Sequence, residues 1–224
     1  MTPKRVTTKK KAKRPATGVR KTPAAAEQKL DLYAKHRNEY LASQMPSFVR
    51  VGPATYFAFA GRGKPGAPDF ATGIGAINNV AFTVKMAHKS GGKDYAVTKL
   101  EALWWRDDDA SEPSKDTTWN WQLLLRVPPF VTDKDLAKAV DGLIAKGKPD
   151  AVRRVQFIEL REDTCVQILH VGAYTEEKES IAKMRAFAER AGRAFSGKHH
   201  EIYLSDPRKV NPDKLRTILR QPVS

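Results

Sequence analysis

The order of the predicted elements occurs twice along the chain, and this repeat limits the folds open to it. Each half reads as a strand, a helix and two further strands. The first half uses residues 55–60, 69–90, 95–105 and 119–127, and the second uses 164–171, 176–192, 199–205 and 217–223. The closing strands resemble each other, 124–128 (LLRVP) and 218–222 (ILRQP), and Glu101 holds a place in its half like that of Glu201. We predict an α+β fold of two fused strand-helix-strand-strand units, about 48–130 and about 150–223, with pseudo-twofold symmetry, antiparallel sheets and a central ligand cleft.

Local patterns supply the other elements. Three- and four-residue spacing predicts a helix over 24–42, and Thr132 is expected to cap a helix that ends at Lys146. Residues 48–51 read as a strand, and 153–160 with 164–171 read as a hairpin across 161–163. The glycine-rich stretch 61–66 lacks the ending of a phosphate-binding loop. The acidic stretch 107–113 lacks the ligand spacing of a calcium loop and is expected to be a solvated connection.

Positive charge is concentrated at the N-terminus. The net charge is +15, and the residues before Ala24 carry nine basic side chains and no acid, which leaves 15 − 9 = +6 for 24–224. Because 1–23 has too little apolar surface to offset the entropy of ordering, we predict a disordered basic tail ahead of one domain over 24–224. The tail is either a non-specific nucleic-acid contact or a solubilising extension.

A single cysteine, Cys165, rules out an intrachain disulfide and suits a reducing compartment. Its strand-like surroundings indicate a buried small side chain and not a nucleophile. No apolar run is long enough to span a membrane, and the N-terminus has no apolar signal region. We therefore expect a cytoplasmic protein with no membrane contact.

The stretch 198–207 (KHHEIYLSDP) reads as a short strand that ends at a turn. Alternation puts His199, Glu201 and Tyr203 on one face. An ionised carboxylate beside aromatic rings attracts cationic or electron-poor planar ligands, and a desolvated one has a raised pKa that suits a general base. A solvated strand face is the plainer interpretation of the same pattern.

Tryptophans gather on the two strands that close the first half. By alternation Trp105 shares a face with Glu101, and Trp121 shares one with Trp119. We expect Trp105 and Glu101 to point into the cleft, and Trp104 to fill core. No Ser-His-Asp arrangement is evident. Adjacent His199 and His200 would point in opposite directions, so neither a metal nor a cofactor is expected.

Several motifs together resemble the GyrI-like (gyrase-inhibitor-like) small-molecule-binding family, in particular its stand-alone bacterial members. They are 100–105 (LEALWW), 119–121 (WNW), 165–172 (CVQILHVG), 197–207 (GKHHEIYLSDP) and 215–223 (LRTILRQPV), and the resemblance covers about 29–223. It implies a cleft between the two units that binds bulky aromatic or cationic compounds. It further implies that Glu201 is a general base with Glu101 as its partner. Ligand binding is assigned to Trp104, Trp105, Trp121, Tyr203, Tyr174 and His170.

Three functions follow as hypotheses. The resemblance implies a detoxifying hydrolase that opens cyclopropane-containing, DNA-alkylating compounds and so confers drug resistance. A second hypothesis is a non-catalytic binder that sequesters or senses such drugs. A third is a gyrase- or DNA-associated interaction protein that uses the basic tail.

Overall fold

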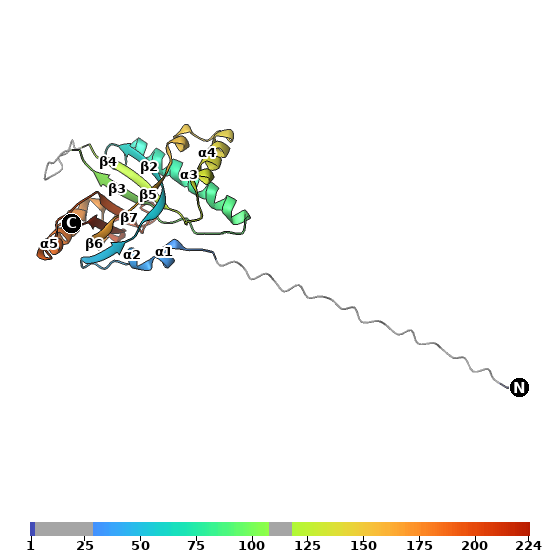
Figure 1. Cartoon of the computed structure of the whole chain (residues 1–224), viewed down its shortest axis with the longest axis horizontal. Helices are drawn as coiled ribbons and strands as arrows, with labels where there is room; N and C mark the ends of the chain where they lie inside the picture. Colours follow the sequence, from blue (N-terminus) through green and yellow to red (C-terminus); the bar gives the residue numbers. More distant parts are fainter. Residues whose placement is uncertain (3–28, 108–117) are drawn as a thin grey trace.

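A computed structural model describes residues 1–2, 29–107 and 118–224. Its eight strands form one antiparallel sheet in the order β1-β6-β8-β7-β3-β4-β2-β5 (Figure 1). The strands are β1 (Ser47–Val51), β2 (Ala54–Arg62), β3 (Glu101–Trp105), β4 (Asn120–Arg126), β5 (Gln156–Leu160), β6 (Asp163–Val171), β7 (His199–Tyr203) and β8 (Arg216–Pro222). The predicted tail 1–23 and most of the acidic stretch 107–113 lie outside the described residues.

The repeat predicted from the sequence is confirmed by the strand order. One half is β2, α3 (Pro68–Ser90), β3 and β4, and the other is β6, α5 (Glu177–Arg190), β7 and β8. The halves meet where β3 pairs with β7 at the middle of the sheet. At the two edges the remaining strands are exchanged, because β1 pairs with β6 and β5 pairs with β2.

This exchange contradicts the predicted hairpin of 153–160 with 164–171. Strand β5 pairs with β2, whereas β6 pairs with β1 and β8. The connection at 161–162 is short enough for a hairpin, but alternation along a strand does not identify its partner. Residues 150–154 form a 3₁₀ helix, η1 (Asp150–Arg154), instead of the start of a strand.

The N-terminal helix is also shorter than predicted. In place of one helix over 24–42, the described part contains α1 (Leu32–Lys35) and α2 (Arg37–Tyr40), which are separated at His36. Asp31 caps α1 by accepting from the backbone N–H groups of Tyr33 and Ala34. The predicted strand 95–105 is regular only over β3. The other helices are α4 (Asp133–Ala145), η2 (Tyr174–Glu176) and η3 (Pro212–Lys214).

The two faces of the sheet have different coverings. Figure 1 shows α3 and α4 on one side of the sheet and α1 and α2 at the other. Facing residues in paired strands point to the same side, so the register traces one row across the helix-covered face. That row is Ile168, Leu219, Glu201, Ala102, Leu123 and Phe59. Its ends belong to apolar clusters with α5 and α3, and Glu201 lies between them.

The register corrects one detail of the predicted repeat. Leu124 lies opposite Glu101, whereas Ile218 lies opposite Ile202. If the closing strands correspond as their sequences indicate, the counterpart of Glu101 is Ile202 and not Glu201. A shift of one residue in a strand moves the side chain to the other face, so the two glutamates do not share a side of the sheet.

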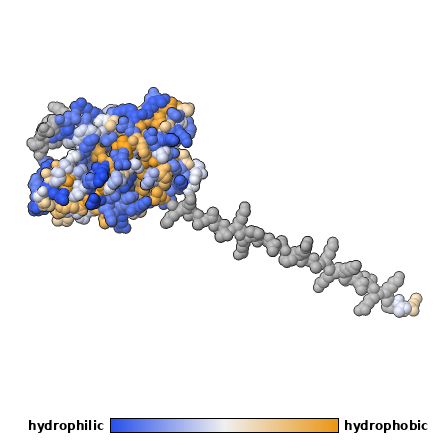
Figure 2. All heavy atoms as spheres, viewed as in Figure 1, coloured by the Kyte–Doolittle hydropathy of each residue, from blue (hydrophilic) through white to orange (hydrophobic). Residues whose placement is uncertain are grey.

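The surface seen in Figure 2 intersperses hydrophilic and hydrophobic residues. Exposed large apolar side chains include Met45, Phe82 and Met86. Among the helices of the described residues, none combines the length and apolar character that crossing a membrane requires.

Candidate active site

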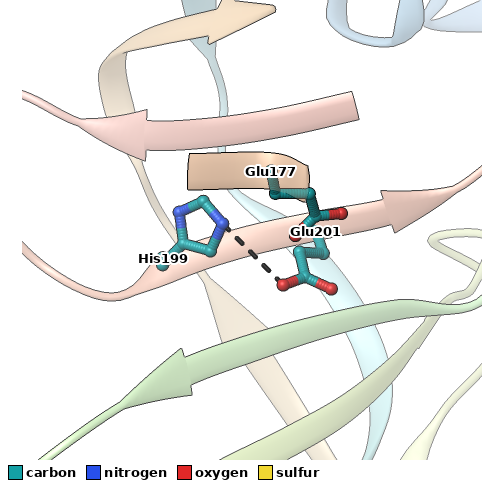
Figure 3. Close-up of side chains that lie close together, drawn as sticks. All are labelled: Glu177, His199 and Glu201. Atoms are coloured by element: carbon teal, nitrogen blue, oxygen red, sulfur yellow. Dashed lines mark ion pairs between the residues drawn. The ribbon is translucent and has the colours of Figure 1, made fainter. Parts of the chain in front are cut away.

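Glu201 lies at the centre of a polar cluster on the helix-covered face. Its Oε2 accepts a hydrogen bond from the Tyr203 hydroxyl at 2.7 Å, and the Trp104 indole N–H donates to that hydroxyl at 3.3 Å. Glu177, the first residue of α5, reaches toward the same carboxylate from above the sheet, and His199 approaches it along β7 (Figure 3). The distance from His199 Nε2 to Glu201 Oε1 is 3.8 Å. Two halves of the chain thus contribute to one site.

The two glutamates share one proton near neutral pH. Burial, together with the charge of Glu201 and a hydrogen bond to it, raises the pKa of Glu177 to about 9. Burial also raises the pKa of Glu201 to about 7, although hydrogen bonds from Tyr203 and Trp104 oppose that shift. Glu177 therefore holds the proton and donates it toward Glu201, which leaves Glu201 as the carboxylate that accepts a proton near pH 7.

His199 is neutral in this cluster. Burial lowers the pKa of its imidazole to about 4, although a hydrogen bond between the ring and the Gln221 side chain opposes that shift. Its Nε2 is buried and has no hydrogen-bond partner in the described residues, and the same holds for Glu177 Oε1. The ligand atoms of Glu177, His199 and Glu201 lie within 4.8 Å of one another, a spacing that would also admit a divalent cation.

A pocket of about 330 Å³ opens beside the cluster, at the end of β7 where His199 lies. Three indole rings and the Phe195 ring contribute to its walls, and the Trp104 indole meets that of Trp119 edge-on at 6.4 Å and stacks on Phe70 behind it at 5.4 Å. The full lining is Trp104, Trp105, Arg106, Trp119, Arg185, Phe195, Ser196, Gly197, His199 and Gln221. Such walls bury planar aromatic ligands.

Two guanidinium groups also line this pocket. Arg106 lies over the Trp119 ring at 5.7 Å, and Arg185 lies over the Phe195 ring at 4.5 Å. They place positive charge along the walls, while the acidic cluster lies deeper in the sheet. The pocket is therefore not a uniformly negative receptor for cations.

Glu101 is in a different environment, and its predicted pairing with Glu201 is wrong. It is fully buried on the opposite face, where its carboxylate accepts from Tyr40 Oη at 3.0 Å and contacts His200 Nε2 at 3.0 Å. The other nitrogen of His200 contacts Glu162 at 3.0 Å, and Arg220 donates to Glu162 at 3.2 Å. Glu39 with Arg126 completes three acids and three bases. The balanced charges indicate a structural network.

The predicted aromatic residues are also divided between environments. Trp121 is fully buried against Phe59 in the core. Trp105 only borders the pocket and shares the face of Glu101, and Lys198 Nζ lies 3.5 Å from its ring centroid. Alternation favoured a core position for Trp104 and the family resemblance assigned it to ligand binding; in the structure it lines the pocket and donates to the Tyr203 hydroxyl. The sequence interpretation placed Trp105 in the cleft because it treated Glu101 and Glu201 as equivalent positions of the repeat.

Tyr174 and His170 lie near the start of α5. The Tyr174 ring meets Tyr203 edge-on at 5.8 Å and is 38% exposed, so it is accessible beside the cluster. His170 is buried and its ring nitrogens contact Ser180 Oγ at 3.0 Å and the Ala173 carbonyl at 3.1 Å. His170 thus fixes the beginning of the helix that carries Glu177.

Sequence reasoning did not single out Glu177. The pair Glu176-Glu177 places negative charge at a helix N-terminus, which is a common and sufficient reason for acids there. Phe70 and Arg185 have no distinguishing pattern in the sequence either: Arg185 reaches the pocket from α5, whereas Phe70 of α3 stacks behind the pocket residue Trp104. Only the packing of both helices on one sheet brings them together.

The match to known proteins agrees with this architecture. Residues 44–224 match the GyrI-like small molecule binding domain. The chain belongs to the GyrI-like family. An uncharacterized conserved protein from Listeria innocua is 35% identical, with a TM-score of 0.81 over 88% of this chain and 100% of that one.

Two further structures from Listeria innocua, each described as a hydrolase, also resemble this GyrI-like chain. They are 34% and 32% identical, with TM-scores of 0.78 and 0.80, and each alignment covers 88% of this chain and 100% of the other. No curated protein matches the chain. The chain is therefore a small-molecule-binding domain by family.

Proposed function

We propose that this GyrI-like protein hydrolyses neutral, planar aromatic compounds that carry a strained electrophilic ring, such as a cyclopropane conjugated to a carbonyl group. The observation that carries the proposal is the Glu201 carboxylate, whose pKa is raised to about 7 by burial beside an indole-walled pocket. A base with this pKa is half deprotonated at neutral pH and still basic enough to accept a proton from water.

The proposed reaction adds one water molecule across the strained C–C bond. The oxygen of a water molecule bonds to a ring CH₂ while Glu201 takes one of its protons. The strained C–C bond breaks, and its electron pair moves through the conjugated system to the carbonyl oxygen, which becomes an anion. Protonation of that anion from Glu201 or solvent gives an alcohol and an enol or phenol. The positive potential of Arg106 and Arg185 on the pocket walls favours the anion as it forms.

The same charges favour neutral substrates over cations. A cationic ligand entering between Trp104, Trp119 and Phe195 would meet two guanidinium groups before it reached Glu201. A neutral ring system stacks on the same indoles without that repulsion. The hydrolase descriptions of two relatives at 34% and 32% identity support an enzymatic role.

A non-catalytic drug binder is the second candidate, and the aromatic walls favour it equally because sequestration needs only burial of the ligand. The two differ in what Glu201 does. A binder uses the charge of Glu201 at most for affinity, whereas a hydrolase uses its basicity for turnover.

The deciding experiment compares wild type with Glu201→Gln on a cyclopropane-containing aromatic probe. Ring opening is followed by mass spectrometry and binding by quenching of tryptophan fluorescence. We expect turnover to fall roughly 10²–10⁴-fold, with the dissociation constant nearly unchanged. Glu159→Gln, at an exposed position of β5, is the matched control. Turnover near the wild-type rate in Glu201→Gln would refute the mechanism, and a wild type that binds the probe without opening it would favour the binder.

A further inference from the structure

We infer that His199, held in one tautomer by Gln221, is the second acceptor that orients the attacking water on Glu201. This role rests on the proposed hydrolysis and adds to it a residue and a hydrogen-bond direction. The supporting features are two facing acceptor atoms, a fixed amide and the position of the imidazole in the pocket wall.

The first feature is the pair of acceptors. His199 Nε2 and Glu201 Oε1 are 3.8 Å apart, and Nε2 is buried without a hydrogen-bond partner among the described residues. An imidazole lone pair facing a carboxylate is unfavourable unless a donor lies between them. A water oxygen about 2.8 Å from each atom would donate one hydrogen to Nε2 and the other to Oε1.

The second feature is the tautomer. Gln221 Nε2 donates to the Ser196 carbonyl, so its amide oxygen is left to accept. The Gln221 side chain is also the hydrogen-bond partner of the His199 ring. Because Nε2 has no partner, Nδ1–H must make that bond, and Nε2 is therefore the bare acceptor. The chain Ser196, Gln221, His199 thus sets a hydrogen-bond direction that ends in the site.

The third feature is the surroundings of the ring. His199 and Gln221 both line the pocket, and Trp104 lies directly opposite His199 on β3. The ionisable groups near His199 are Glu201 on its own strand, Glu177 on α5, His200 on the opposite face, and Arg106 and Arg185 in the pocket wall. Glu201 Oε1 faces His199 Nε2 at 3.8 Å, so it is the carboxylate atom placed to take the water proton. His199 orients the oxygen lone pair and keeps its own charge state.

The test separates orientation from binding and from folding. His199→Phe keeps a planar ring without an acceptor, and Gln221→Met keeps the bulk without the amide. We expect kcat to fall about 100-fold in His199→Phe and less in Gln221→Met, with the affinity for the aromatic probe nearly unchanged. His199→Asn, which retains an acceptor, should recover part of the rate. His36→Gln is the control, because it removes another imidazole that lies 3.6 Å from a glutamate.

A second measurement holds even if the variants fold poorly. ¹⁵N chemical shifts of the wild-type imidazoles at pH 7 should assign His199 to the Nδ1–H tautomer, and Gln221→Met should give a mixture. An Nε2–H tautomer in the wild type, or a normal kcat in His199→Phe, would overturn the inference. Loss of activity on dialysis against a chelator, with recovery on adding Zn²⁺, would indicate that Glu177, His199 and Glu201 bind a cation. That result would also overturn the inferred role of His199.

If wild type does not open the probe but the tautomer is as inferred, the proposed hydrolysis fails and the hydrogen-bond chain stands. If wild type opens the probe and His199→Phe does so equally well, the hydrolysis stands and the role of His199 fails. The two proposals are therefore decided separately.

Discussion

Replacing Glu101 with Gln tests whether this second buried carboxylate is structural or catalytic. Glu101 is fully buried and contacts His200 at 3.0 Å and Tyr40 at 3.0 Å, on the face of the sheet away from the pocket. We expect Glu101→Gln to lower the free energy of unfolding by about 1–3 kcal/mol, because it removes one of the two acidic partners of a buried imidazolium. Turnover per folded molecule should stay near wild type.

The magnitude can be worked from His200. Burial lowers the pKa of His200, but the charge of Glu162 and hydrogen bonds to Glu101 and Glu162 outweigh it and raise the pKa to about 9. The unfolded value is 6.5. The difference corresponds to roughly 3 kcal/mol, since one pKa unit is about 1.4 kcal/mol, and because Glu162 and Glu101 produce it together it is the upper limit for Glu101 alone. This stability is fully present below pH 6.5 and is lost as the pH rises through about 9.

Urea unfolding at pH 7 and pH 10, followed by circular dichroism, measures the stability lost in Glu101→Gln and the pH dependence that His200 contributes. Wild type should lose roughly 3 kcal/mol more than His200→Gln between these pH values, because glutamine does not titrate there. Glu159→Gln, on the exposed side of β5, controls for loss of a carboxylate. If Glu101→Gln unfolds within about 0.5 kcal/mol of wild type yet loses turnover more than about 100-fold, the structural assignment is wrong.

Three further predictions address the site, the core and the tail. The rate of ring opening should rise as the pH passes about 7, where Glu201 deprotonates, and fall above about 9, where Glu177 deprotonates; Glu177→Gln should abolish the upper fall in a pH–rate profile. Gly61→Ala should lower stability by about 1–3 kcal/mol in urea titrations, because its Cβ would lie 2.2 Å from the Trp121 ring; an unchanged midpoint would contradict this packing. Deleting 1–23 should remove most salt-sensitive DNA binding in a filter or anisotropy assay and leave turnover unchanged; DNA affinity that persists and ignores salt would exclude a role for the tail.

The repeat was predictable because it depends on patterns within short segments. Apolar alternation and helical spacing locate most strands and α3, and the resemblance of 124–128 to 218–222 links the halves. Strand exchange at the edges was not predictable, because β1 and β5 obtain their partners from distant parts of the chain. The helix over 24–42 failed where Asp31 and His36 favour local turns.

One part of the candidate site, the face of β7, could be predicted from the sequence, whereas the residue that α5 contributes could not. The face of β7 with His199, Glu201 and Tyr203 follows from alternation alone, and the structure retains it. The partner of Glu201 does not follow, because it comes from α5, whose sequence gives a separate reason for Glu177 at its first turn. Alternation also grouped Trp105 with Glu101 correctly. The expectation that this pair faces the cleft came from aligning Glu101 with Glu201, and the register of the strands does not support that alignment.

The two faces of β7 have opposite electrostatic environments. An alignment of the two halves that is wrong by one residue therefore assigns a glutamate to the wrong environment. On one face His200 is charged and held by Glu101 and Glu162, which fixes the strand by balanced ion pairs. On the other face His199 is neutral and Glu201 is partly protonated, since burial there is not compensated by opposite charge. The ion pairs around His200 order the strand. On the other face, Glu201 has no opposite charge beside it and keeps a raised pKa, as a general base requires. A slip of one residue in β7 would turn Glu201 to the face of Glu101, so the register of β7 against β3 determines whether Glu201 faces the pocket.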